Sequence, residues 1–240
     1  MMRVTAHESG AIWLRALRGA ALGIAVAVWL VLCAAAWVAL IGVMVPAHAA
    51  ESPRTALEYR RDLTREARAV FGLSAPVPVF AAQIQQESAW RPRAESPYAQ
   101  GLAQFVPSTA DWISEVYPYL GPADVWNPQW SIRAMVRYDK HLLDRYAKPA
   151  ASDCDAWAFT LSAYNGGQGW LLRDKRQCRN ATRCPSCDPT RWFGHVADTP
   201  DPRRANWAVE ENRGYPQRIL LRHQPRYRHW GPTVACDVPA

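Results

Sequence analysis

The feature that most constrains this chain is a stretch of 29 residues, 19–47, without a single charged side chain. It is longer than the ~20 apolar residues that an α-helix needs to cross the hydrocarbon core of a bilayer. Arg3, Arg15 and Arg18 precede it, and positive charge beside a membrane helix tends to stay on the cytoplasmic side. The sequence therefore predicts a membrane-inserting N-terminal helix, with everything after it exported.

Two fates of this segment fit the sequence. Residues 47–49 read Ala-His-Ala, and small residues at this spacing are typical of a signal-peptidase site. The apolar core of a signal peptide is usually only ~7–15 residues long, however, about half of this run. Residues 1–50 are thus either a cleaved signal peptide or a retained anchor that contacts the inner membrane through residues 19–46. A buried helix of a soluble core is disfavoured, since the stretch is hydrophobic on every face.

The chain is basic, with 28 Lys and Arg against 21 Asp and Glu and a net charge of +7. Such a balance suggests an anionic partner: nucleic acid, a membrane surface or an acidic polymer. The basic residues are scattered and form no Lys/Arg block interleaved with aromatic residues. Export makes contact with nucleic acid less plausible still, so we expect no nucleic-acid partner.

Five of the six cysteines follow the uncharged stretch, and exported proteins meet an oxidising environment. They are Cys154, Cys178, Cys184, Cys187 and Cys236. Because five is odd, at most two disulfides form within the chain. Two alternatives are a zinc site made by the three cysteines of residues 178–187 with His195, and a redox pair at Cys184 and Cys187. Disulfides are favoured, since no helix pattern begins at Cys184 to lower a thiol pKa, and no metal or cofactor is expected.

The exported part is predicted to be mainly α-helical, because apolar residues recur at helical spacing and no strand-like alternation of useful length occurs. Residues 155–164 are nearly all apolar or aromatic, which predicts a central helix buried on most sides and ended by Gly166-Gly167. Residues 176–204 contain three Cys and several Pro without periodicity, which indicates an irregular insert pinned by disulfides. Four other helices are predicted at residues 55–71, 76–88, 127–146 and 205–223, the last of them interrupted at 214–216. A further helix is predicted to begin at residue 107.

Short motifs occur in order between residues 86 and 220, the first and most specific beginning with Gln86-Glu87-Ser88. Together they resemble the signature of the SLT-type lytic transglycosylases, relatives of goose-type lysozyme. The resemblance implies a mainly α, lysozyme-like helical domain over residues 51–240 with a glycan-binding cleft, located in the periplasm. The motifs cover residues 86–97, 101–110, 127–138, 163–167 and 211–220.

Glu87 is the predicted catalytic residue. Cleaving a glycosidic bond near neutral pH requires a donor carboxyl whose pKa is raised by an apolar environment. Ile84 and Trp90 are near neighbours in the sequence, and burial against the 155–164 helix would keep the proton on the carboxyl. The resemblance implies that this one carboxyl serves as both acid and base, without the second carboxylate of other glycosidases. Glu95 is the nearest rival.

The resemblance also implies the reaction, which is cleavage of the β-1,4 bond between N-acetylmuramic acid and N-acetylglucosamine. The muramyl 6-hydroxyl attacks its own anomeric carbon and leaves a 1,6-anhydro end, and an internal nucleophile has a high effective concentration. Two alternatives stay open: a muramidase that hydrolyses the same bond with water, and a non-catalytic glycan-binding assembly protein. The expected partners are peptidoglycan glycan strands. Because small members of the family often open the wall for transenvelope machines, the resemblance also implies components of a secretion or conjugation system as partners.

Further site residues carry over from the same motifs. A serine would lie near the acetamido group and a glutamine would line the cleft, while a Tyr-Asn pair would close the site above the catalytic Glu. A late Glu and Tyr complete the pattern, and one tryptophan is expected to stack on a sugar face. The residues expected to bind the glycan are Ser96, Gln104, Tyr164, Asn165, Glu211, Tyr215 and Trp90.

The sequence departs from the family pattern on the sugar-binding side. The loop at residues 97–100 is one residue short, Ala103 stands in place of a methionine and Pro216 in place of a valine. We expect the short loop to move Gln104 relative to Glu87 and to change sugar binding more than proton transfer.

Overall fold

The computed structural model describes residues 53–180 and 184–237 of the 240-residue chain. These residues lie in one compact unit, Ala49–Ala240. The predicted membrane segment at residues 19–47 and the predicted start of the domain at residue 51 fall outside the described residues. Within the described part, no helix is both long and apolar enough to cross a membrane.

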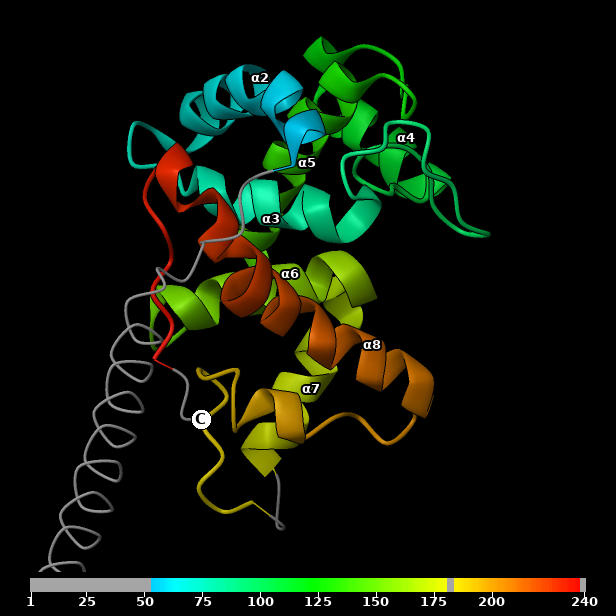
Figure 1. The fold of residues 1–240 in the computed structure, drawn as a ribbon. Helices are drawn as coiled ribbons and strands as arrows, with labels where there is room; N and C mark the ends of the chain where they lie inside the picture. Colours follow the sequence, from blue (N-terminus) through cyan, green and yellow to red (C-terminus); the bar gives the residue numbers. More distant parts are fainter. Residues whose placement is uncertain (1–52, 181–183, 238–240) are drawn as a thin grey trace, which may run out of the picture. The chain divides into compact units, whose positions relative to one another are not determined.

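The described residues are mainly helical, as predicted, and their strand-like pairing is limited to two isolated bridges in one loop. Figure 1 shows α3 and α6 in the middle of the unit, with α2 and α5 at one end and α7 at the other. The α-helices are α2 (Arg54–Phe71), α3 (Val77–Ser88), α4 (Pro107–Val116), α5 (Pro128–Leu142), α6 (Asp153–Gly166), α7 (Gln168–Asn180) and α8 (Asn206–Gln217). Shorter 3₁₀ or π-helical segments are η1 (Pro118–Leu120), η2 (Leu143–Ala147), η3 (Val196–Asp198), η4 (Arg218–His223) and η5 (Gln224–Trp230).

Local sequence explains where the two long inner helices begin and end. The side-chain oxygen of Asn127 accepts two backbone N–H groups of the first turn of α5, and Pro128 occupies the first helical position. The Ser152 hydroxyl accepts the N–H of Asp155 at 3.1 Å and caps α6. Gly167, with φ 88°, ends α6 in a conformation that glycine adopts without strain. The predicted start at residue 127 and the predicted end at the Gly-Gly pair are confirmed.

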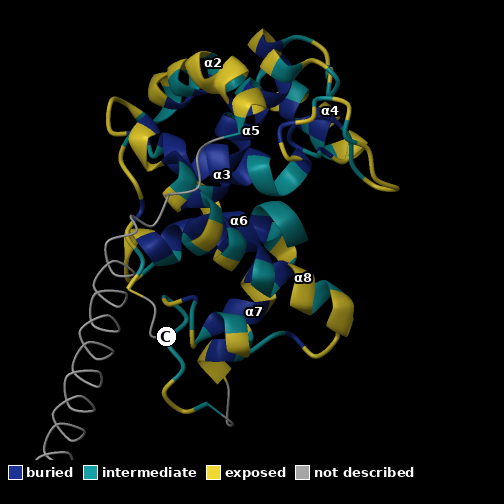
Figure 2. Cartoon of the chain, viewed as in Figure 1, coloured by how far each residue is buried: buried dark blue, intermediate teal, exposed yellow. Residues whose placement is uncertain are grey.

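The core is built around α3 and α6, which Figure 2 shows largely in dark blue. Phe80 of α3 and Trp157 of α6 meet edge to face, with ring centroids 5.3 Å apart, and Phe71 of α2 packs against both rings. The prediction that residues 155–164 form a central, nearly all-buried helix is confirmed. Because α3 also belongs to this core, a side chain at its end is rigidly placed.

Helix α7 differs from the prediction, which starts an irregular insert at about residue 176. The buried face of α7 includes Leu171, Asp174 and Lys175, so charged residues hide its hydrophobic period. Both charges find polar partners inside the fold, which is what allows them to be buried. The remaining described part of the insert, residues 184–204, is irregular apart from η3, as predicted.

The predicted interruption at residues 214–216 is wrong, because α8 runs through Gly214, Tyr215 and Pro216 to Gln217. Proline lacks the N–H that a helix interior uses. Tyr215 and Pro216 are buried against the core, however, and tertiary packing outweighs the local penalty. The chain then continues as η4 and η5, which extends the helical region beyond residue 223.

Two disulfides occur among the described residues, Cys154–Cys236 and Cys178–Cys187, and Cys184 is free. The disulfide prediction is confirmed. The zinc alternative is wrong, because two of its three sulfur ligands are bonded to each other. The redox alternative is wrong for the same reason, since Cys187 is paired with Cys178 and not with Cys184.

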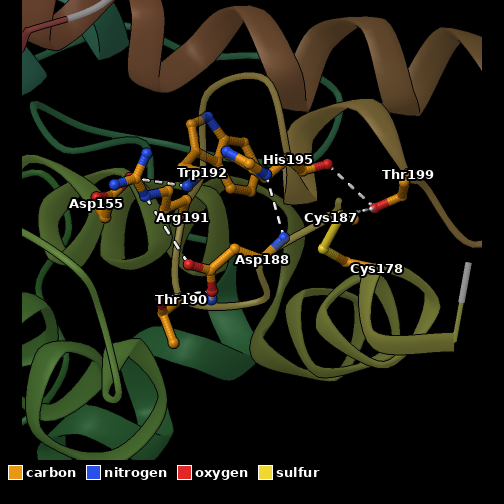
Figure 3. The surroundings of a disulfide bond; sticks show 9 residues. All are labelled: Asp155, Cys178, Cys187, Asp188, Thr190, Arg191, Trp192, His195 and Thr199. Atoms are coloured by element: carbon orange, nitrogen blue, oxygen red, sulfur yellow. Dashed lines mark hydrogen bonds and ion pairs between the residues drawn. A yellow bond between two sulfur atoms is a disulfide. The ribbon is translucent and has the colours of Figure 1, made fainter. Parts of the chain in front are cut away.

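Figure 3 shows how the 178–187 bridge is embedded in the insert. The Nδ1 atom of His195 accepts the backbone N–H of Asp188 at 3.1 Å. The backbone N–H of Trp192 donates to Asp155 at 2.8 Å, and the fully buried Trp192 ring meets Phe159 of α6 edge to face. The insert is therefore fastened to α6 and plays a structural part in the fold.

Candidate active site

Glu87 lies in the last turn of α3. The helix ends abruptly, because Ala89 and Trp90 both adopt left-handed backbone angles, with φ of 50° and 65°. Such angles are uncommon for residues with a Cβ, and they concentrate at functional sites. The backbone N–H of Ala89 closes the last turn on the oxygen of Gln85 at 3.2 Å. The chain then leaves the core as a loop, so Glu87 stands at the border between core and surface.

Tyr215 of α8 holds the Glu87 carboxyl by donating its phenolic hydrogen to Oε1. Burial raises the pKa of Glu87 to about 8, the hydrogen bond from Tyr215 lowers it, and the charge of nearby Glu211 raises it. With Oε1 engaged, Oε2 is left to carry the proton. This arrangement can present a proton donor at neutral pH.

The two residues before Glu87 are tied to the C-terminal segments as well. Gln85 accepts a hydrogen bond from the Tyr227 hydroxyl at 2.9 Å, and Gln86 accepts one from Nε of Arg218 at 3.2 Å. Three consecutive side chains of α3 therefore contact residues 128 to 142 positions later in the chain. These contacts set the rotation of α3 about its axis and with it the direction of the Glu87 carboxyl.

Tyr164, near the end of α6, lies close enough to Glu87 to interact with its charge, and Asn165 follows Tyr164 in the same helix. The Tyr164 hydroxyl donates to the backbone oxygen of Ala103 at 2.8 Å. Burial and then the charge of Glu87 raise the pKa of Tyr164 well above its ordinary value. Asn165 Nδ2 lies 3.5 Å from Glu211 Oε1. The structure thus brings the predicted α6 and α8 residues together, but the direct partner of the carboxyl is the α8 tyrosine.

A buried amide that the sequence analysis missed supports this side of the site. Asn212 is fully buried and donates to Asn165 Oδ1 at 3.0 Å and to a backbone oxygen of α6 at 2.9 Å. Its own oxygen accepts from Nη1 of Arg204 at 3.1 Å. A Cβ at Gly166 would come within 2.3 Å of Arg204 Nη2 and 2.7 Å of Asn212 Nδ2, so a side chain there would displace both groups. Asn212 lies inside the 211–220 motif, and this position in the sequence is the signal that could have identified it.

The loop after α3 contains two further predicted residues, and both bind its backbone. Ser96 Oγ accepts the N–H of Ala99 at 3.0 Å and donates to the oxygen of the same residue at 3.1 Å. Gln104 Nε2 donates to the backbone oxygens of Ala94 at 3.0 Å and Gly101 at 2.9 Å. In this structure both side chains shape the loop.

Glycine is required at position 101 of that loop. Gly101 has φ 80°, and a Cβ there would lie 1.9 Å from the backbone oxygen of Val125. Glu95, the rival carboxylate, is exposed and accepts a hydrogen bond from Gln100 Nε2 at 3.1 Å. That bond engages Glu95 in the loop's own structure.

The prediction that Trp90 stacks on a sugar face is wrong. Its side chain is 1% exposed, and Nε1 donates to the Tyr227 hydroxyl at 2.8 Å. The ring packs against Tyr59, Tyr227 and Trp230. The physical reason is that the large ring fills the space between α2, α3 and η5, so neither face is open to a ligand.

A buried acid of α5 that the sequence analysis also missed, Asp139, lies near enough to Glu87 to interact with its charge. Gln83 precedes Glu87 by four residues on the same face of α3, and its Nε2 lies 3.4 Å from Asp139 Oδ1. Both side chains are fully buried, and Gln83 Oε1 and Asp139 Oδ2 have no hydrogen-bond partner among the described residues. Burial raises the pKa of Asp139 well above its ordinary value, the Gln83 contact lowers it, and the charge of Glu87 raises it. Asp139 is a single acidic residue among the mostly apolar buried residues of α5. One such residue gives little sign in the sequence that it lies near the site.

Cavity size does not identify this site. One cavity of about 610 Å³ is lined by Glu66, Arg133 and Arg137, and there Glu66 and Arg137 pair with each other at 3.2 Å. Another, of about 540 Å³, is lined by Cys154 and Asp155. The candidate site is instead identified by the group of buried carboxyl and phenol side chains with shifted pKa values around Glu87.

Comparison with known proteins identifies the family that this chain resembles. Residues 71–183 match the family model described as Transglycosylase SLT domain. The resemblance to SLT-type lytic transglycosylases inferred from the motifs is therefore confirmed.

Two curated relatives bear the same name. The chain is 28% identical over 138 residues to membrane-bound lytic murein transglycosylase F of Vibrio cholerae serotype O1, a match that covers 57% of this chain and 24% of the relative. It is 35% identical over 101 residues to the protein of that name from Yersinia pestis (strain Pestoides F), covering 42% of this chain and 19% of the relative. The chain thus matches about a quarter or less of the length of these relatives.

Among solved structures, the fold matches the 70-kDa soluble lytic transglycosylase in its complex with bulgecin A. The TM-score is 0.50 and the identity 24%, over 77% of this chain and 26% of that chain. This match concerns the fold, and it confirms the mainly helical, lysozyme-like architecture expected from the sequence.

Proposed function

We propose, from the match of residues 71–183 to the transglycosylase SLT domain model, that the chain is a peptidoglycan lytic transglycosylase. The bond cleaved would be the β-1,4 link between N-acetylmuramic acid and N-acetylglucosamine, and the product would carry a 1,6-anhydromuramyl end. The names of the curated and solved relatives support this assignment. The observation that carries it is the Glu87 carboxyl at the end of α3, which accepts a hydrogen bond from Tyr215 and whose pKa is raised by burial to about 8.

Glu87 would act first as the general acid. With a pKa of about 8, its carboxyl is mostly protonated at pH 7. Oε2 would give its proton to the glycosidic oxygen, while the bond between that oxygen and the muramyl anomeric carbon breaks. The departing N-acetylglucosamine keeps this proton as its new 4-hydroxyl.

The resulting carboxylate would then act as the base. It would take the proton of the muramyl 6-hydroxyl as that oxygen bonds to the anomeric carbon, so Glu87 regains its proton and no water is consumed. Attack within one sugar has a high effective concentration. The hydrogen bond from Tyr215 favours the ionised form of Glu87, and it would stabilise the carboxylate between the two steps.

The glycan strand would lie in a cleft formed by the end of α3, the loop at residues 94–105 and α8. Tyr164 would border the reacting sugar, and the polar pair of Asn165 and Glu211 would bind its hydroxyl or acetamido groups. Ser96 and Gln104 would contribute by holding the loop in the shape that meets the sugar. Support for this placement comes from the contacts that join these elements around Glu87.

The reaction would take place in the periplasm. The uncharged run within residues 1–50 supports export of the chain, and the curated relatives are named membrane-bound. Fractionation and N-terminal sequencing of the mature protein would distinguish a retained anchor from a cleaved signal peptide. Local wall opening for a transenvelope secretion or conjugation system is the proposed use, and it rests on the motif resemblance alone.

Digestion of purified peptidoglycan with mass analysis of the fragments tests the proposal. The wild type should release 1,6-anhydromuramyl products, and Glu87→Gln should release none. A hydrolytic muramidase would release reducing ends heavier by one water, and a non-catalytic binding protein would release no fragments. Glu115→Gln, which changes an exposed carboxylate of α4, is the matched control and should keep full activity. Undiminished activity of Glu87→Gln would contradict the proposed function.

A further inference from the structure

An exposed tryptophan lies at the beginning of α8. The Trp207 side chain is 69% exposed, and no hydrogen bond or ring contact with the described residues engages it. A single exposed aromatic residue has no meaning by itself. The position of Trp207 on the helix is what relates it to the active site.

Trp207, Glu211 and Tyr215 follow one another at intervals of four residues, so they lie along one flank of α8. Tyr215 donates to Glu87, and Glu211 lies beside Asn165. The flank therefore leads outward from the proton donor. Trp207 is about two helical turns, or ~12 Å, beyond Tyr215 along the helix axis.

Polar groups line the same flank between its ends. Gly214 has no side chain, and the Arg218 guanidinium lies across it, since a Cβ at residue 214 would be 2.3 Å from Arg218 Nη1. Arg218 also donates to Gln86, the neighbour of Glu87. Figure 2 shows exposed residues on the outer side of α8. Carboxylate and guanidinium groups suit the hydroxyl and acetamido groups of a sugar, so the path from Trp207 to Glu87 fits a saccharide strand.

We propose that Trp207 is a stacking platform for a saccharide ring of the peptidoglycan glycan strand, remote from the bond that Glu87 cleaves. An exposed indole presents a wide, rigid apolar face, and burying it against the apolar face of a sugar is favourable. The occupant is the same strand that Glu87 would cleave, because the flank is continuous with that site. This inference rests on the proposed function, and it gives the stacking role expected of Trp90 to a different tryptophan.

Steady-state kinetics with uncrosslinked glycan strands of defined length provide the test. In Trp207→Ala, KM for long strands should rise about tenfold, with kcat unchanged. The shortest cleavable fragment should show no change, because it does not reach Trp207. Trp207→Phe should restore KM to within about twofold, since phenylalanine keeps an aromatic face. Leu73→Ala is the control, an exposed residue (84%) at the opposite end of α3 from Glu87, and should behave as wild type.

Binding to the inactive enzyme gives a second readout. Long strands should change the tryptophan fluorescence of Glu87→Gln, and this change should be lost in the Glu87→Gln, Trp207→Phe double variant. An unchanged KM in a folded Trp207→Ala protein would overturn the stacking role. If Glu87→Gln is inactive while Trp207→Ala behaves as wild type, only this inference fails. If Glu87→Gln stays active, the proposed function fails.

Discussion

The phenolic O–H of Tyr215 donates to Oε1 of Glu87, although the two residues lie 128 positions apart in the chain. Tyr215 is itself 2% exposed, so the bond forms at the inner edge of the site. Burial raises the pKa of Glu87 to about 8, and this bond works in the opposite direction. Tyr215 therefore limits how far burial raises the pKa of the proposed proton donor.

Tyr215→Phe should move the alkaline limb of the pH–rate profile to higher pH. Loss of the donor that stabilises the carboxylate raises the pKa of Glu87 above the wild-type value of about 8. The enzyme would then keep its active, protonated form to higher pH. At pH 7, kcat should fall roughly tenfold, because the carboxylate formed in the first step loses a hydrogen bond of about 1.5 kcal/mol. Tyr119→Phe, on the exposed η1 segment, is the control. An alkaline limb at the same pH in Tyr215→Phe and in the wild type would contradict the role of Tyr215 in lowering the pKa of Glu87.

Asp139→Asn should make the protein more stable at neutral pH. The folded state keeps a proton on Asp139 that the unfolded state loses above its ordinary pKa of 3.8, so the wild type loses stability as pH rises above about 4. Asparagine stays neutral, and its Nδ2 can donate to the unpartnered Oε1 of Gln83. Melting temperatures from pH 4 to pH 9 should show an advantage that grows with pH. Asp139→Ala, which leaves both Gln83 groups unpaired, should be less stable, and a pH-independent difference for Asp139→Asn would refute the argument.

Asn212→Ala should lower the free energy of unfolding by roughly 2–4 kcal/mol. The amide of Asn212 is fully buried and satisfies Asn165, Arg204 and the backbone of α6 at once. Its removal leaves several buried groups unpaired. Urea denaturation would measure the loss, with Glu210→Ala, an exposed position on the same helix, as the neutral control. Equal stability of the two variants would show that the network contributes nothing.

Replacing the Cys154–Cys236 pair with serines should destabilise the protein more than replacing Cys178–Cys187. The first bridge has a sequence separation of 82 and the second a separation of 9. Loop-closure entropy gives about 4.5 kcal/mol for the longer loop and about 2.5 kcal/mol for the shorter one. Urea denaturation of the two double-serine variants under oxidising conditions would measure both losses. The reverse order would show that native-state packing around the bridges outweighs the entropy of the unfolded chain.

Local patterns predicted much of the fold. The helix starts at residues 107 and 127 and the central helix at 155–164 follow from caps, prolines and apolar spacing over a few turns. Where buried faces carry charged residues, as in α7, or where packing overrides a proline, as at Pro216, local patterns predicted the wrong structure. In both places the outcome depends on partners elsewhere in the chain.

The sequence alone determined the helical class, the motif resemblance and the position of Glu87 at a helix end, because each is written in residues close together in the chain. Only the tertiary structure decided that Tyr215 and not Tyr164 contacts the carboxyl, that Trp90 is buried while Trp207 is open, and that Asp139 lies near Glu87. These relationships depend on how helices separated by 50 or more residues rotate and pack against one another. That rotation minimises buried unpaired groups and empty space across the whole core, and no local segment carries this information.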